Sequence, residues 1–237
     1  MSYFYKLKKI KSENLVIYHH LGLGDHIICA GLINYLSETF KNIHLPVKKH
    51  NAENIRHLFS NLQNVHIFNI EKNEGKEVDD FAKKNNLPIL KLGFEKMKDP
   101  FDMSFYKQIK LPYSISYDYF HLVNDKKQEK DLKDFVLNFY NISNSKFILI
   151  HNETSLMKYD LRIQNSNAAY VSKESDKFGN IFLYKRLIED AEEIHCVNSS
   201  FLHLVERVET NAKLYYHQTR FGPLSLKKDW KVLKYEN

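Results

Sequence analysis

A turn rich in histidine and glycine, residues 19–26 (HHLGLGDH), has the residue types best suited to chemistry in this chain. It follows an apolar run, residues 15–18, that predicts a buried strand, and it precedes apolar residues at helical spacing that predict a helix over 25–40. Glycines let backbone N–H groups approach a ligand closely, and the start of a helix favours negative charge. The turn therefore predicts a strand–turn–helix site that presents an acid, Asp25, with histidines on either side. The alternative is that Asp25 only caps the helix.

The same turn does not fit two common nucleotide-binding motifs. A dinucleotide site needs G-x-G-x-x-G and an acidic residue about 20 positions later. Here the third glycine position is Ile27, and the later stretch, residues 47–50 (VKKH), is basic. The sequence contains no G-x-x-x-x-G-K-[ST], so a P-loop is excluded as well.

A second motif lies at residues 194–206 (IHCVNSSFLHLVE), where an apolar strand-like run leads into a helix-like one. Ser199 or Ser200 is expected to cap the helix, predicted over 199–208. The first-turn N–H groups and the two hydroxyls could hold a diphosphate without a metal, and His203 is close enough to join them. The alternative is an ordinary helix cap.

The order of elements predicts two α/β halves. Strands are expected at 15–18, 43–47, 65–70 and 89–92, then at 147–150, 170–171, 194–197 and 214–217. Helices are expected at 25–40, 51–59 and 77–84, then along an amphipathic stretch after residue 124, at 181–191 and at 199–208. Strands that alternate with helices imply βαβ units and parallel sheets. We therefore expect two Rossmann-like domains, 1–124 and 125–237, facing across a cleft.

Polar side chains follow each predicted strand, where open parallel sheets bind their ligands. These residues are His19, His20, Asp25, Lys48, Lys49, His50, His151, Asn152, Glu153, Ser172, Lys173, Asn198, Ser199, Ser200, His217 and Arg220. Most are basic or histidine, which would suit a phosphorylated ligand.

Composition indicates a globular protein, with 43% apolar residues, 16 Phe, 15 Tyr and few glycines. Its net charge of +6 would suit a phosphate-bearing ligand or peripheral contact with an anionic membrane surface, but no arginine-rich arm supports nucleic acid. Two cysteines, Cys29 and Cys196, lie in apolar runs and predict buried free thiols. With no apolar leader and no long apolar run, we expect a cytoplasmic protein.

The paired motifs carry a resemblance. A Gly-Asp turn that opens the first helix, with a late strand running into Ser199-Ser200-Phe201-x-His203, resembles GT-B glycosyltransferases. The nearest likeness is to the heptosyltransferase-like branch, which builds cell-surface polysaccharide. The resemblance implies transfer of a sugar from a nucleotide-diphosphate sugar to a saccharide or glycan, with Asp25 as general base. Asn198 departs from the family, where an acid is common at this position.

The resemblance and the residues together define the candidate site. The donor would contact His151, Lys173, Ser199, Ser200 and His203. The acceptor or a phosphate would contact His20, Gly24, His26, Lys49, Arg162 and Arg220. No metal or cofactor is expected, because the sequence has no zinc-ligand spacing and no D-x-D of the kind that metal-dependent glycosyltransferases use.

Three points stay open from the sequence. The protein could be an epimerase or hydrolase of nucleotide sugars, which would need no acceptor. It could also be a sugar-nucleotide-binding module without catalysis. The aromatic residues of 101–120 are expected to pack in the core or between domains, although Tyr106 or Tyr113 could instead stack on a sugar face.

Overall fold

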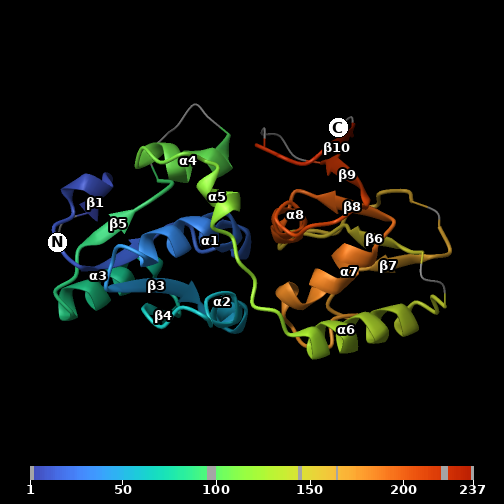
Figure 1. Ribbon diagram of the computed structural model, residues 1–237, viewed down its shortest axis with the longest axis horizontal. Coiled ribbons are helices and arrows are strands. Elements are labelled where there is room, and N and C mark those ends of the chain that lie inside the picture. Colours follow the sequence, from blue (N-terminus) through green and yellow to red (C-terminus); the bar gives the residue numbers. More distant parts are fainter. Residues whose placement is uncertain (1–2, 95–99, 144–145, 164, 220–223, 236–237) are drawn as a thin grey trace. The chain divides into compact units, whose positions relative to one another are not determined.

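The computed structural model describes residues 3–94, 100–143, 146–163, 165–219 and 224–235. The chain divides into two compact units, one of residues 1–123 and 222–225, the other of residues 124–221 and 226–237. Each unit has its own sheet of five strands, and every strand pair is parallel (Figure 1). The α/β architecture with two parallel sheets is as the sequence predicted.

The first sheet has the strand order β1-β5-β2-β3-β4. Its strands are β1 (Tyr3–Phe4), β2 (Asn14–Tyr18), β3 (Asn42–Lys48), β4 (Val65–Ile70) and β5 (Ile89–Lys91). Its helices are η1 (Leu7–Lys9), α1 (Leu23–Ser37), η2 (Lys49–Asn51), α2 (Ala52–Leu58), α3 (Glu74–Lys84), α4 (Phe101–Gln108) and α5 (Ile115–Asp118). From β2 the chain adds β3 and β4 on one side and then β5 on the other. The topology therefore reverses between β2 and β5, the position where such sheets open a crevice for ligands.

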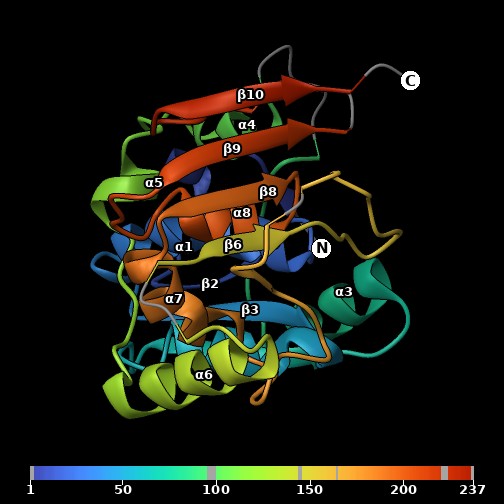
Figure 2. The ribbon, with the colours of Figure 1, turned by 90° about the vertical axis from the view of Figure 1, so that its right-hand side faces the viewer.

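The second sheet has the order β10-β9-β8-β6-β7, and Figure 2 shows β10, β9, β8 and β6 side by side and pointing the same way. Its strands are β6 (Ile148–His151), β7 (Ala168–Tyr170), β8 (Glu193–Val197), β9 (Lys213–Gln218) and β10 (Trp230–Lys234). Its helices are α6 (Lys126–Phe139), η3 (Ile181–Tyr184), α7 (Lys185–Asp190) and α8 (Ser200–Val205). Here β7 is added on one side of β6 and β8 on the other, so the topology reverses between β6 and β8.

Alternation along β2 illustrates how the sequence builds the core. Val16 and Tyr18 point to one face, since successive side chains of a strand alternate, and there they pack against Val78 and Ala82 of α3. Helix α1 is buried nearly all round, with ten of its residues removed from solvent. A helix without a polar face needs cover on several sides, which fits the apolar run of residues 27–33 in α1.

The aromatic stretch 101–120 forms helices α4 and α5, and its main role is packing inside the first unit. Phe105 and Tyr106 are fully buried. The Tyr106 hydroxyl donates to the carbonyl of Ile28 at 2.7 Å, and the Tyr113 hydroxyl donates to Asp102 at 2.8 Å. The alternative that Tyr106 stacks on a sugar is therefore wrong, because its ring has no exposed face.

The sequence patterns missed two edge strands, β1 and β10. Strand β10 begins at Trp230, whose indole nitrogen donates to Glu206 at 2.6 Å, while the backbone N–H of Lys228 donates to the same side chain at 3.1 Å. A buried carboxylate thus fixes the start of a strand whose own residues, WKVLK, alternate weakly. The described residues contain no helix long and apolar enough to cross a membrane.

Candidate functional site

Asp25 lies in the first turn of α1, which begins after Gly22. The carboxylate packs so closely over this glycine that a Cβ at Gly22 would lie 2.5 Å from Oδ2 of Asp25. Gly22 has an ordinary extended backbone, with φ at −70°, so what requires glycine here is the space that the carboxylate takes. The position of the Asp25 carboxylate therefore depends on residue 22 being glycine.

Burial raises the pKa of Asp25 from 3.8 to about 6. Electrostatic interactions with His20 and Lys48 and hydrogen bonds from backbone N–H groups of Gly22 and Asp25 oppose this shift without cancelling it. Lys48 ends β3 and forms an ion pair with Glu74 at 2.8 Å. A carboxylate that titrates near neutrality is well matched to taking a proton from a substrate.

The three histidines around this turn have different surroundings. His20 is half-buried, and its Nε2 lies 2.9 Å from the carbonyl oxygen of Gly93, just after β5. His19 is buried, and burial lowers its pKa to about 4. His26 is fully buried, and burial lowers its pKa well below 6.5. Neither ring nitrogen of His26 has a hydrogen-bond partner among the described residues, and its ring packs edge-on against His19 at 4.5 Å between centroids.

These contacts change the expected roles. His20, Gly24 and Asp25 all lie at the carboxyl end of β2, beside the reversal of topology. His26, which the sequence placed in contact with the acceptor or a phosphate, is fully buried inside the unit. Lys49 is exposed and forms an ion pair with Glu71 at 3.4 Å. Lys48, which the sequence placed in the same basic stretch, is the lysine whose charge reaches Asp25.

In the second unit, His151 and Ser199 meet at the reversal of topology between β6 and β8. His151 ends β6, Ser199 precedes α8, and Nδ1 of His151 lies 3.0 Å from the Ser199 hydroxyl. The imidazole stacks on Phe201 at 5.2 Å, and burial lowers its pKa to about 4. This pair is therefore neutral at physiological pH and offers hydrogen bonds without charge.

The expected helix cap is wrong in one respect. Ser199 is the N-cap residue of α8, but its side chain makes no capping hydrogen bond; its hydroxyl instead lies 3.0 Å from Nδ1 of His151. Ser200 is the first residue of the helix. His203 is buried with its pKa lowered to about 3, so its imidazole carries no positive charge for a phosphate.

The remaining basic candidates lie apart from this pair in the chain and differ in setting. Lys173 is exposed after β7. Arg162 is exposed in a left-handed conformation (φ 51°), and its charge lowers the pKa of Tyr235, which burial raises. It thus belongs to the second unit, near the end of β10. Arg220 lies outside the described residues.

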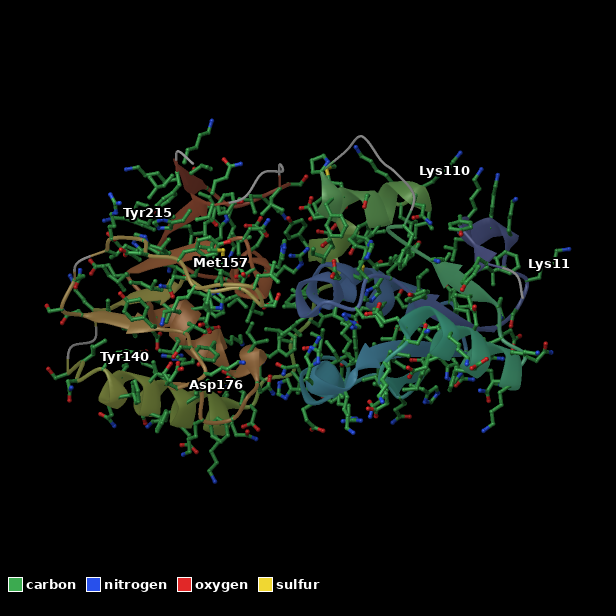
Figure 3. The ribbon with its side chains drawn as sticks, turned by 180° about the vertical axis from the view of Figure 1, so that it is seen from behind. Lys11, Lys110, Tyr140, Met157, Asp176 and Tyr215 are labelled. Carbon is green, nitrogen blue, oxygen red and sulfur yellow. The ribbon has the colours of Figure 1, made fainter. Side chains whose placement is uncertain are left out.

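A chain of buried polar groups crosses the second sheet and was not predicted. Nδ1 of His195 lies 2.9 Å from Nε2 of His217, whose Nδ1 lies 2.6 Å from the Tyr235 hydroxyl. His195 also stacks flat on Tyr215 at 4.4 Å; Figure 3 labels Tyr215 on β9. The sequence signal was present in the alternation of His195 and His217 with apolar neighbours. Among the residues that the structure describes, no cluster of three His, Cys, Asp or Glu side chains could hold a metal ion.

No protein-family model matches this chain, and no curated protein matches it by sequence. Among solved structures, it is similar to the glycosyl transferase family 9 protein from Veillonella parvula DSM 2008. The TM-score is 0.60 and the sequence identity 9%, over 96% of this chain and 89% of that one. The fold is GT-B-like. Two Rossmann-like units with parallel sheets were predicted from the sequence, and at this identity the likeness concerns the fold alone.

Proposed function

We propose that this protein is a glycosyltransferase of the heptosyltransferase-like branch, which moves a sugar from a nucleotide-diphosphate sugar to a saccharide or glycan acceptor. The observation that carries the proposal is Asp25. It is a half-buried carboxylate with a pKa near 6, held over Gly22 at the ligand-binding edge of the first sheet, in a chain with a glycosyltransferase-like fold.

In this proposal Asp25 is the general base. As the acceptor oxygen bonds to the anomeric carbon of the donor, its proton passes to the Asp25 carboxylate. The bond between the anomeric carbon and the phosphate oxygen breaks, and the nucleoside diphosphate leaves with the electron pair. A base is most effective when its pKa lies near the working pH, which is what burial achieves at this position.

The second unit would bind the donor. His151 and Ser199 present an imidazole and a hydroxyl at the reversal of topology, and Ser200 and the exposed Lys173 add a further hydroxyl and a cation. We infer that protein groups rather than a metal stabilise the leaving diphosphate, because the sequence has no D-x-D. His203 would contribute through its place in α8 and not through charge.

The test is turnover by the whole chain and by its Asp25→Asn variant. Wild-type protein is first screened by thermal shift against UDP-, GDP-, ADP- and CMP-sugars, because a bound ligand raises the melting temperature by mass action. Nucleotide release is then measured with the selected donor and a panel of saccharides. Loss of a positioned base costs about 10²–10⁴-fold in rate, and we expect a loss of that size for Asp25→Asn with the donor still bound.

Asp80→Asn is the matched control, since Asp80 is exposed on α3 of the same unit. It should keep wild-type turnover. Nucleotide release without any acceptor, equally fast in its presence, would instead indicate a hydrolase or epimerase. Binding of a nucleotide sugar without turnover under any pairing would indicate a binding module.

A further inference from the structure

The first unit exposes two large aromatic side chains at one place. Phe94, just after β5, is 37% exposed, and Phe101, at the start of α4, is 46% exposed. Both contact the same imidazole: His20 stacks on Phe94 at 4.4 Å and meets Phe101 at 5.5 Å between centroids. We propose that Phe94 and Phe101, with His20, form a stacking platform for the ring of an uncharged saccharide acceptor next to Asp25. This inference rests on the proposed glycosyl transfer.

Contacts with Gly93 and Phe105 hold the platform in place. The carbonyl oxygen of Gly93 accepts a hydrogen bond from Nε2 of His20 at 2.9 Å. Gly93 has φ at +79°, and a Cβ there would come within 2.4 Å of the buried Phe105 ring, so no other residue fits. Phe105 in turn packs edge-on against Phe101 at 5.1 Å. Aromatic faces fixed before binding lose little freedom when a ligand arrives.

Lys91, the last residue of β5, holds the Phe94 ring of the platform. Its ammonium lies 4.5 Å above the ring of Phe94 and 4.5 Å above that of Tyr3, and 5.4 Å from that of Tyr18. A cation over an aromatic face is attracted by the electron density of the ring. The charge of Lys91 is therefore used to hold Phe94, the ring on which His20 stacks.

The position of the platform relates it to Asp25. Phe94 follows β5 and His20 follows β2, so the aromatic pair lies at the reversal of topology, where ligands bind in open sheets. His20 and the Asp25 carboxylate interact electrostatically. Because a carbonyl oxygen can only accept, Nε2 of His20 donates to Gly93, and Nδ1 is the ring nitrogen that remains for a sugar hydroxyl.

The charges at this edge favour a neutral ligand. Lys48 is paired with Glu74, Lys49 is paired with Glu71, and Lys91 lies against aromatic rings. Two of the three positive charges are thus paired with carboxylates, and the third lies over aromatic rings. A pyranose ring fits this surface, because its C–H face is apolar and its edge carries hydroxyls. A phosphorylated sugar would find these cations already engaged.

The test measures binding of methyl pyranosides by NMR titration, without any donor. Methyl glucoside, galactoside and N-acetylglucosaminide are compared with hexose 6-phosphates and hexuronic acids. Stacking of this kind is worth about 3- to 10-fold in affinity per ring. We expect wild-type protein to bind at least one neutral pyranoside, and Phe101→Ala and Phe94→Ala each to weaken that binding 3- to 10-fold. Phe101→Tyr should restore it.

Two controls make the result specific. Phe139→Ala removes an equally exposed phenylalanine, 48% exposed on α6, and should leave binding unchanged. Asp25→Asn should keep pyranoside binding while it lowers transfer about 10²–10⁴-fold, which separates the platform from the general base. In kinetics with an active donor, Phe101→Ala should raise the acceptor KM and leave kcat and its pH profile unchanged.

Three results would overturn the platform. One is that no neutral pyranoside binds wild-type protein. The second is that the phosphorylated or acidic sugars bind more tightly than their neutral counterparts. The third is that both phenylalanines are needed instead for binding to vesicles of phosphatidylcholine and phosphatidylglycerol, which would make them a lipid contact. Turnover of nucleotide sugars by wild-type protein in any of these cases would preserve the proposed function and exclude only the platform.

Discussion

The carboxyl ends of the two sheets carry chemically different side chains at equivalent points of their topology. In the first sheet the reversal between β2 and β5 presents Asp25, a carboxylate that titrates near neutrality. In the second, the reversal between β6 and β8 presents His151 and Ser199, a hydrogen-bonded pair whose imidazole is neutral. The same architecture thus holds a proton acceptor in one unit and neutral donors and acceptors in the other.

Burial explains the pKa values of both Asp25 and His151, and it shifts them in opposite directions. Removing a group from water penalises its charged form, which raises the pKa of a carboxyl and lowers that of an imidazole. Asp25 therefore holds a proton more readily than a free aspartate, whereas His151 loses one more readily than a free histidine. Desolvation therefore raises the pKa of Asp25 to about 6 and leaves the His151 imidazole neutral at that pH.

Among variants that test this comparison, the largest fall in turnover is expected when the Asp25 carboxylate is displaced. Gly22→Ala introduces a methyl group whose carbon would stand 2.5 Å from Oδ2 of Asp25, too close for both to keep their places. The backbone of Gly22 accepts alanine, so the side chain of Asp25 should move and the fold should survive. Because a misplacement of about 1 Å can cost 10²-fold, we expect turnover to fall about 10- to 100-fold, measured by nucleotide release.

Gly75→Ala is the matched control, because a Cβ at Gly75 meets nothing within 4 Å. It should leave both turnover and the melting temperature near wild type. Wild-type turnover in Gly22→Ala would show that the position of Asp25 does not matter to the reaction.

A smaller effect is expected from the second edge. Replacing Ser199 and Ser200 together by alanine removes two hydroxyls and leaves His151 without its 3.0 Å partner. A hydrogen bond contributes about 0.5–1.5 kcal/mol, so nucleotide affinity should fall about tenfold by calorimetry, with little change in the melting temperature. Ser166 is exposed just before β7, at the amino end of the strands of the same sheet, and Ser166→Ala should bind the nucleotide normally. Equal affinities in both variants would remove the serines from the donor site.

The smallest expected effect is on the pH dependence of folding stability, which should differ between His151 and Asp25. The pKa of His151 is near 4 in the folded protein and near 6.5 in the unfolded chain. Between these values the unfolded chain binds more protons, so the stability contributed by neutral His151 is present above pH 6.5 and is lost as pH falls towards 4. His151→Gln should flatten this acid loss in urea unfolding, while His50→Gln, exposed on η2, should not.

Asp25 should show the opposite sign in the same measurement. Its pKa is raised from 3.8 to about 6, so the folded protein binds more protons in that interval and Asp25 destabilises the fold above pH 6. Asp25→Asn should therefore be more stable than wild type at pH 7.5, by up to about 3 kcal/mol at about 1.4 kcal/mol per pKa unit, with the difference vanishing near pH 4. A difference independent of pH would mean that the Asp25 carboxyl is not desolvated.

Much of the fold could be predicted because apolar periodicity is a local signal. The expected strands at 43–47, 65–70 and 194–197 match β3, β4 and β8 to within a residue or so at each end. The helix expected over 25–40 is α1, which begins two residues earlier and ends three earlier. Strands β1 and β10 were not predicted, because each depends on partners distant in sequence: β1 pairs with β5, and β10 is fixed by Glu206.

The candidate site was predictable only in part, for the same reason. Asp25, His20, His151 and Ser199 follow strands, so their place at a ligand-binding edge could be inferred from order alone. Which of their neighbours is buried could not. His26 and His203 looked like His20 in the sequence, yet the fold buries their rings and leaves them neutral.

The sequence by itself determined two α/β halves, the Gly-Asp turn and the polar ends of the strands, because these depend on residue type and spacing along a few turns of chain. The tertiary structure decided the chemistry of those residues. It buried Asp25 enough to raise its pKa, joined His151 at the end of β6 to Ser199 after the neighbouring strand β8, and placed Phe94 and Phe101 in contact with His20. Desolvation and pairing depend on what long-range packing brings near, and no local pattern contains that information.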